Sequence, residues 1–204
     1  MSIFSFINPL HFSPQKKFWK WFVKHRKVLF EFEKDRENIF DNLAAEMNKV
    51  HPALTFEFGP ILKNRAREFV ISAGGIKEVF PFVQALYDAA PNLPEWSFIK
   101  FRPRRKFIND IKFDRILIKV SDVYYRIFKD QDKVGLIMFI EGCNNANKDI
   151  YRNIGYLFLD DALGEYDVEM KVGFIEIESK ESKYFGEAQP LLNLAQHFDE
   201  YYEL

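Results

Sequence analysis

The chain has 204 residues, a formal net charge of −1 and an unusually high phenylalanine content, with 23 Phe residues. This length fits one domain, or two small ones, with a substantial hydrophobic core. The balanced charge gives no overall field that would attract a polyanion, so a nucleic-acid partner is not expected. Cys143 is the only cysteine, which excludes an internal disulfide and fits a reducing cytoplasm.

The N-terminal stretch from Met1 to Leu10 is apolar, but it lacks a basic leader and is interrupted by Pro9. It is too short to span a bilayer and does not follow the pattern of a signal peptide. We therefore expect this stretch to pack on the domain, we predict no membrane span, and the cytoplasm is the expected compartment.

The first predicted helix begins at Ser13 and Pro14, because a serine cap followed by proline favours helix initiation. Phe18, Trp21 and Phe22 form an apolar stripe along it, with lysines between them. A basic helix that carries tryptophan could lie on a membrane surface. The same pattern is more typical of a buried aromatic face with solvated lysines on the other side.

The clearest pattern follows a second predicted helix, which runs from about residue 33 to 49. Alternating apolar residues predict a strand from Leu54 to Phe58, which ends at Gly59-Pro60, and an antiparallel strand around Phe69. Helical periodicity begins near residue 76, and a third strand is predicted at residues 96–101. A right-handed crossover would make the strands at Phe69 and Phe98 parallel.

Three segments of this region, FEFGP, REFVISAGGIKEVFPFVQALYDAAPNLPEW and FRPRR, resemble a family of uncharacterised bacterial cytoplasmic proteins. The similarity covers residues 18–105. That family carries no assigned activity, ligand or catalytic residue. The resemblance therefore implies a bacterial, soluble, single-domain protein and no functional residue.

The order strand, strand, helix, strand returns between residues 123 and 178. Strands are predicted at 123–128 and 134–140, a helix begins near Asn145 or Asn147, and a last strand covers about 166–178. In that last strand the apolar residues are even-numbered up to Val172 and odd-numbered from Ile175, which predicts a β-bulge near Gly173 and Phe174 that keeps both sets buried. A C-terminal helix is predicted at about 190–202.

Together these elements predict one α+β domain over residues 1–204. Its core would be a mixed, largely antiparallel sheet of about seven strands, built from two strand-strand-helix-strand units at 54–102 and 123–178. An N-terminal helical pair within residues 1–50 and a C-terminal helix within 188–202 would flank the sheet. The residues show no convincing repeat, so duplication is only suggested by the order of the elements.

The sequence contains no metal-binding signature. None of the four histidines lies at ligand spacing from a cysteine or another histidine, so no metal and no cofactor are predicted. Gly74 and Gly75 lie between a strand and a helix, where an anion-binding turn could form. Two glycines at such a position more commonly supply the unusual backbone angles of a tight connection.

The segment Arg102-Pro103-Arg104-Arg105-Lys106 is the densest positive cluster. It could contact a phosphate or an acidic partner, or it could be a solvated loop. Cys143 precedes a predicted helix whose N-terminus would lower its pKa, but no histidine is near in sequence and a buried structural cysteine is more common. The acidic residues between 160 and 169 are expected to be solvated.

Because no catalytic constellation is visible, the sequence favours a non-catalytic binding or regulatory protein that acts through protein–protein contact, for example an immunity or inhibitor protein. The alternative is a small-molecule or phosphate-ligand enzyme that uses Gly74, Gly75 and the cluster at residues 102–106, with Cys143 as a further candidate. This enzyme would need these segments to converge on one concave site. The same arginines beside Phe101 and Phe107 could bind nucleic acid only on a continuous basic face.

Overall fold

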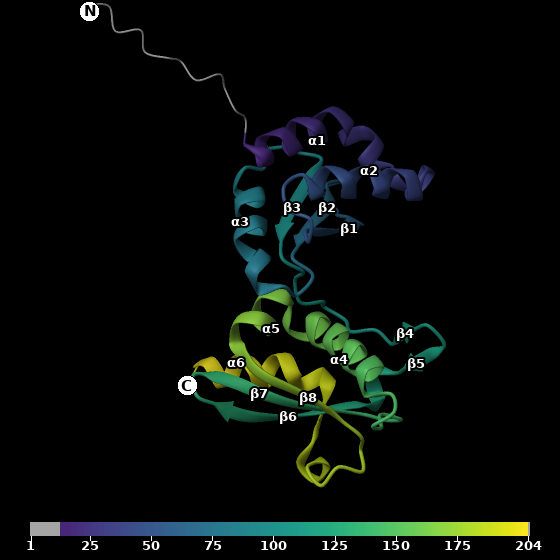
Figure 1. The fold of residues 1–204 in the computed structure, drawn as a ribbon, viewed down its shortest axis with the longest axis vertical. Coiled ribbons are helices and arrows are strands. Elements are labelled where there is room, and N and C mark those ends of the chain that lie inside the picture. Colours follow the sequence, from purple (N-terminus) through teal and green to yellow (C-terminus); the bar gives the residue numbers. More distant parts are fainter. Residues whose placement is uncertain (1–12, 204) are drawn as a thin grey trace, which may run out of the picture. The chain divides into compact units, whose positions relative to one another are not determined.

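A computed structural model describes residues 13–203 of the chain, which divides into two compact units, residues 1–100 and 101–204 (Figure 1). Both units combine helices with strands, so the α+β class is confirmed. The single domain stays a prediction. The expected packing of residues 1–10 lies outside the described residues.

Over its described residues, 13–100, the first unit contains three α-helices and a three-stranded sheet. Its elements are α1 (Pro14–Phe30), η1 (Phe32–Lys34), α2 (Arg36–Asn48), β1 (Thr55–Ile61), β2 (Arg67–Ser72), η2 (Lys77–Val79), α3 (Phe80–Asp88) and β3 (Trp96–Lys100). The predicted start of the first helix is confirmed, because the Ser13 hydroxyl accepts a hydrogen bond from the Lys16 amide at 3.4 Å and Pro14 is the first helical residue.

The sheet of the first unit has the order β1-β2-β3. β1 is antiparallel to β2 and β2 is parallel to β3, as predicted, and the register places Phe69 opposite Phe98. The predicted end of the first strand at Gly59-Pro60 is wrong, since β1 continues to Ile61. A register shift between Phe58 and Ile61 lets the strand pass the proline, which has no N–H to donate.

Aromatic rings fill the core of the first unit. The Phe22 ring on α1 lies 5.2 Å from the Phe69 ring and 5.0 Å from the Trp96 ring, centroid to centroid. Trp19, rather than Trp21, belongs to this buried face, and its indole N–H donates to the carbonyl oxygen of Leu86 at 2.7 Å. The aromatic stripe of α1 is therefore part of the core.

The second unit contains a short hairpin, a four-stranded sheet and three α-helices. Its elements are β4 (Ile111–Phe113), β5 (Ile116–Ile118), η3 (Val120–Asp122), β6 (Val123–Asp130), β7 (Lys133–Ile140), α4 (Lys148–Leu163), α5 (Glu165–Lys171), β8 (Val172–Glu178), η4 (Phe185–Glu187), β9 (Gln189–Pro190), η5 (Leu191–Asn193) and α6 (Leu194–Glu203). Strands β4, β5 and β9 lie outside the two strand-strand-helix-strand units that the sequence predicts.

The four-stranded sheet has the order β8-β7-β6-β9. β6 and β7 are antiparallel, and β7 and β8 are parallel. The predicted β-bulge is confirmed, because Val134 pairs with Val172 while the next residue, Gly135, pairs with Phe174. The predicted start of this strand is wrong, since residues 165–171 form helix α5.

The prediction of one sheet of about seven strands is wrong. The strands form separate sheets of three, two and four strands. The physical reason is that each half of the chain supplies its own core: aromatic rings fill the first core, and a mainly aliphatic cluster from residues 118–198 fills the second. The N-terminal and C-terminal helices consequently pack in different units, not on one shared sheet.

The core of the second unit lies between its sheet and two helices. Met138 of β7, Phe158 of α4 and Phe198 of α6 are all fully buried in it. On the opposite face of the sheet, the Phe185 ring packs against the rings of Tyr124 and Phe139, with centroids 5.4 Å apart in both cases. Both faces of this sheet are thus covered within the unit, at least in part.

Candidate functional site

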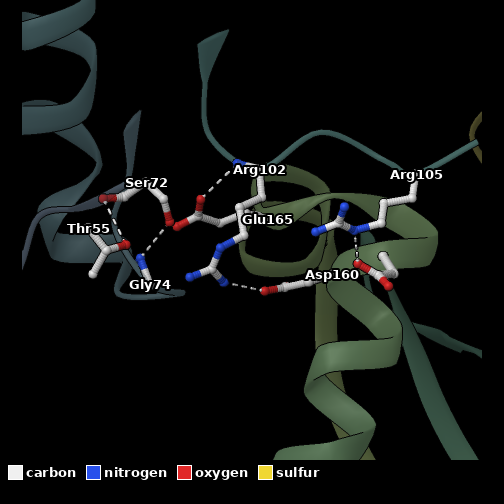
Figure 2. Close-up of polar contacts among 8 residues, drawn as sticks. Thr55, Ser72, Gly74, Arg102, Arg105, Asp160 and Glu165 are labelled. Atoms are coloured by element: carbon white, nitrogen blue, oxygen red, sulfur yellow. Dashed lines mark hydrogen bonds and ion pairs between the residues drawn. The ribbon is translucent and has the colours of Figure 1, made fainter. Parts of the chain in front are cut away.

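Gly74 and Gly75 form the turn between β2 and η2. Both have left-handed φ values, 63° and 76°, which strongly favour glycine. The amide of Gly74 donates to the hydroxyl of Ser72 at 2.9 Å, and Ser72 is fully buried (Figure 2). The Gly74 amide is therefore already bonded within the turn. The backbone angles fit the interpretation that the two glycines are needed to form a tight connection.

The arginine segment, residues 102–105, is bonded to carboxylates of its own unit. Arg102 pairs with Asp160 at 2.9 Å (Figure 2), and Arg105 pairs with Asp161 at 2.6 Å. The Arg102 amide also donates to the Glu165 carboxylate at 3.0 Å, and the Glu165 amide donates back to the Arg102 carbonyl oxygen at 3.0 Å. The segment is thereby tied to the junction of α4 and α5.

Arg104 connects three helices of the second unit. Its guanidinium pairs with Asp167 of α5 at 2.7 Å and with Asp199 of α6 at 2.8 Å. Its Nε donates to the Leu163 carbonyl oxygen at the end of α4 at 2.9 Å, a favourable place for a cation. Gly164, with φ 79°, allows the close approach of this segment, because a Cβ there would lie 3.1 Å from the backbone nitrogen of Arg104.

Two of the acidic partners, Asp160 and Glu165, are largely shielded from solvent. Glu165 is fully buried, and the expectation that the acidic residues at 160–169 are solvated is wrong for it. Burial raises the pKa of Asp160 to about 6, although the charge and hydrogen bond of Arg102 lower it. Desolvation thus outweighs a good ion pair at this carboxyl.

Cys143 lies in the loop before α4, as predicted, but its environment does not activate it. The residue is only 6% exposed. Burial raises the pKa of its thiol, while Lys148 lowers it and Glu178 raises it further. A thiol with a raised pKa is a poor nucleophile at neutral pH, which is the reverse of the effect expected from the helix N-terminus.

The arginine segment and Cys143 are not brought together. The arginines bind the C-terminal end of α4, whereas Cys143 precedes its N-terminal end. A helix of 16 residues is about 24 Å long, so these groups lie at opposite ends of it. Gly74 and Gly75 belong to the first unit.

A different group of residues surrounds a cavity of about 400 Å³ in the second unit. It lies beside β6 and is lined by Tyr125, Arg126, Ile127, Glu187, Gln189, His197, Glu200 and Tyr201. The Tyr125 hydroxyl shares a hydrogen bond with Nδ1 of His197. Burial, followed by the charge of Glu200, raises the pKa of Tyr125, so the phenol keeps its proton at neutral pH.

The cavity borders an open edge of the sheet. β9 pairs with β6 only at Tyr124 and Tyr125. In the part of the chain that the structure describes, no strand pairs with residues 126–130 on this side. Backbone N–H and C=O groups on such an edge can accept another strand.

Sequence patterns give little indication of this site. Tyr125 lies on the same face of its strand as Val123 and Ile127, so the alternation predicts a core residue. His197 follows Leu194 by three residues and thus lies near the buried stripe of its helix, which was the one available signal. Their pairing joins residues 72 positions apart and depends on the fold.

No protein-family model matches the chain, and no curated protein or solved structure matches it. The resemblance to a family of uncharacterised bacterial proteins therefore stays a prediction. Within residues 13–203, no group of three or more His, Cys, Asp or Glu side chains could hold a metal ion. No helix in that range has both the length and the apolar character needed to cross a bilayer.

Proposed function

We propose that the protein acts by binding another protein, and that an extended segment of the partner pairs with the outer edge of β6. The observation that carries this proposal is the open edge at residues 126–130 next to the cavity of about 400 Å³. A binding or regulatory protein, such as an inhibitor or immunity protein, works through a contact of this kind without chemistry of its own.

The chemistry of the cavity indicates which side chain the partner inserts. Glu187 and Glu200 line it, and Glu187 is already paired with Arg126. Glu200 accepts a hydrogen bond from Gln196 at 2.8 Å and has no basic partner among the described residues. A strand beside β6 that points a Lys or Arg side chain toward α6 would complement this carboxylate.

The test is to purify the full-length protein from its own cells and to map any bound protein by hydrogen exchange. We expect slower exchange of the backbone amides at residues 126–130 in the complex. The substitution Glu200→Arg should weaken the complex at least tenfold, because it places like charges together. Glu176→Arg is the matched control, since Glu176 is exposed on β8 at the other edge of the same sheet.

The proposal is overturned if a bound protein leaves exchange at residues 126–130 unchanged, or if Glu200→Arg has no larger effect than Glu176→Arg. The enzyme alternative gains no support from the observed bonds. The Gly74 amide is bonded to Ser72, and Arg104 is paired with two carboxylates. A small molecule that co-purifies at the glycine turn would favour the enzyme.

A further inference from the structure

Helix α1 displays a row of lysines opposite its buried aromatic face. With 3.6 residues per turn, all of them fall within an arc of about 100°. Phe18 and Phe22, on the far side of the helix, are almost completely buried, so α1 cannot rotate to hide the row. We call this row the lysine stripe; it consists of Lys16, Lys17, Lys20, Lys24 and Lys27, all exposed.

Among residues 13–203, no carboxylate pairs with the lysine stripe. None of its members forms an ion pair with any residue in the range 13–203, whereas Arg26 on the same helix pairs with Glu95 at 3.1 Å. Helix α1 itself contains no acidic residue. Residues 1–12, which precede it in the sequence, also contain no Asp or Glu.

This arrangement opposes the stability of the helix. Lys16, Lys20 and Lys24 are spaced four residues apart, the spacing at which like charges repel. Lys16 and Lys17 lie in the first turn, where the helix dipole disfavours positive charge and no acidic side chain compensates. Folding therefore does not explain the stripe, and an external anionic partner would.

We infer that the lysine stripe docks the protein on an anionic lipid surface. Lysines are flexible point charges that suit a surface of mobile headgroups, and the stripe contains no arginine fork for bidentate phosphate recognition. Val28, which borders the stripe, is 54% exposed, and this aliphatic group can contact the headgroup region. The contact is electrostatic, because the aromatic face of α1 is used in the core.

The stripe lies in the first unit and the open edge of β6 in the second, so this inference does not depend on the proposed protein contact. The full-length protein should bind phosphatidylcholine vesicles that contain phosphatidylserine, and it should not bind vesicles of phosphatidylcholine alone. The triple variant Lys17→Gln, Lys20→Gln, Lys24→Gln should bind about 100-fold more weakly, at roughly fivefold per lysine. Raising the salt concentration should release the wild-type protein.

The matched control is Lys63→Gln, Lys77→Gln, Lys112→Gln, which removes the same charge from exposed positions outside α1. It should retain wild-type binding, and circular dichroism should show that both triple variants are folded. Failure of the wild type to bind phosphatidylserine vesicles would overturn the inference, as would an equal loss in the control. Tighter, stripe-dependent binding to a DNA duplex would also overturn it, in favour of nucleic acid.

Discussion

The two basic regions of the chain have opposite relations to their surroundings. The arginines of residues 102–105 pair with carboxylates of α4, α5 and α6, whereas the lysine stripe of α1 has no carboxylate partner among the described residues. The first region joins parts of one unit. The second presents uncompensated charge to whatever lies outside the molecule.

The side-chain types match this difference. An arginine fork can bind two carboxylates in a fixed geometry, as Arg104 does with Asp167 and Asp199, and still donate to a helix end. Lysines hold one flexible charge each and order little around them. A cluster of positive charge is therefore evidence of binding only when the fold leaves it unpaired.

Arg104 offers the strongest test of this comparison. Arg104→Ala should lower the free energy of unfolding by about 3 kcal/mol, because it removes two ion pairs and the side-chain donor to the Leu163 carbonyl oxygen, and it leaves the partly buried Asp167 with Lys171 alone. Urea denaturation followed by circular dichroism measures this change.

The control for Arg104 is Arg152→Ala, which breaks an exposed pair with Asp149 at 3.5 Å. An exposed pair contributes about 0.5 kcal/mol, so this variant should stay close to the wild type. If the two alanine variants lose equal stability, the arginine segment does not tie the helices together, and the contrast with the lysine stripe disappears.

Asp160 should give the second unit a distinctive pH dependence. Its pKa is raised to about 6 in the folded protein, above the ordinary value of 3.8, so the folded state binds this proton more tightly. The resulting stabilisation is fully present below about pH 4 and is lost as the pH rises through 6. Asp160→Asn keeps an oxygen that can accept a hydrogen bond from Arg102, but it cannot titrate.

The unfolding free energy of the wild type, measured relative to Asp160→Asn, should therefore fall by about 2 kcal/mol between pH 4 and pH 7. Asp199 should give a pH dependence of stability of the opposite sign, because the hydrogen bond from Arg104 lowers its pKa. Relative to Asp199→Asn, the wild type should lose stability as the pH falls below about 4. A wild-type advantage over Asp160→Asn that grows with pH would contradict the burial of Asp160.

Local rules were sufficient wherever the determinants lie close together in the sequence. The Ser13 cap, the parallel direction of the strands that contain Phe69 and Phe98, and the bulge at Gly173 all follow from capping chemistry, the right-handed crossover and parity. Helix α5 could not be predicted in this way, because Val168, Met170 and Val172 alternate with polar residues as they would in a strand. Seven helical residues are too few to show a helical period, and the ion pair of Asp167 with Arg104 holds them from outside.

The candidate site and the division into two sheets depend on contacts between distant segments. The arginines and their acidic partners are both visible in the sequence, but about 60 positions separate Arg102 from Asp160 and Glu165. The open edge of β6 follows from where β9 stops, which no periodicity records. Sequence patterns showed which charges exist, and only the fold showed which of them are compensated.

The smallest expected effect tests whether the lysine stripe costs stability. Lys20→Gln removes repulsion with Lys16, Lys17 and Lys24 at spacings of three and four, so it should raise the free energy of unfolding by about 0.5 kcal/mol at low salt. Glutamine and lysine have similar helix propensities, so propensity does not account for such a gain. The gain should shrink in high salt.

Lys27 is the control within the same helix, because it lies in the last turn, where a positive charge is favourable. Lys27→Gln should lower the free energy of unfolding by about 0.3 kcal/mol at low salt, because the favourable interaction with the helix dipole outweighs the repulsion from Lys24, three residues away. Opposite signs at the two positions would show that Lys20 is held against its local energetics, as expected of a surface kept for a partner. If Lys20→Gln is instead destabilising, the stripe contributes to the fold, and its contrast with the arginine segment is lost.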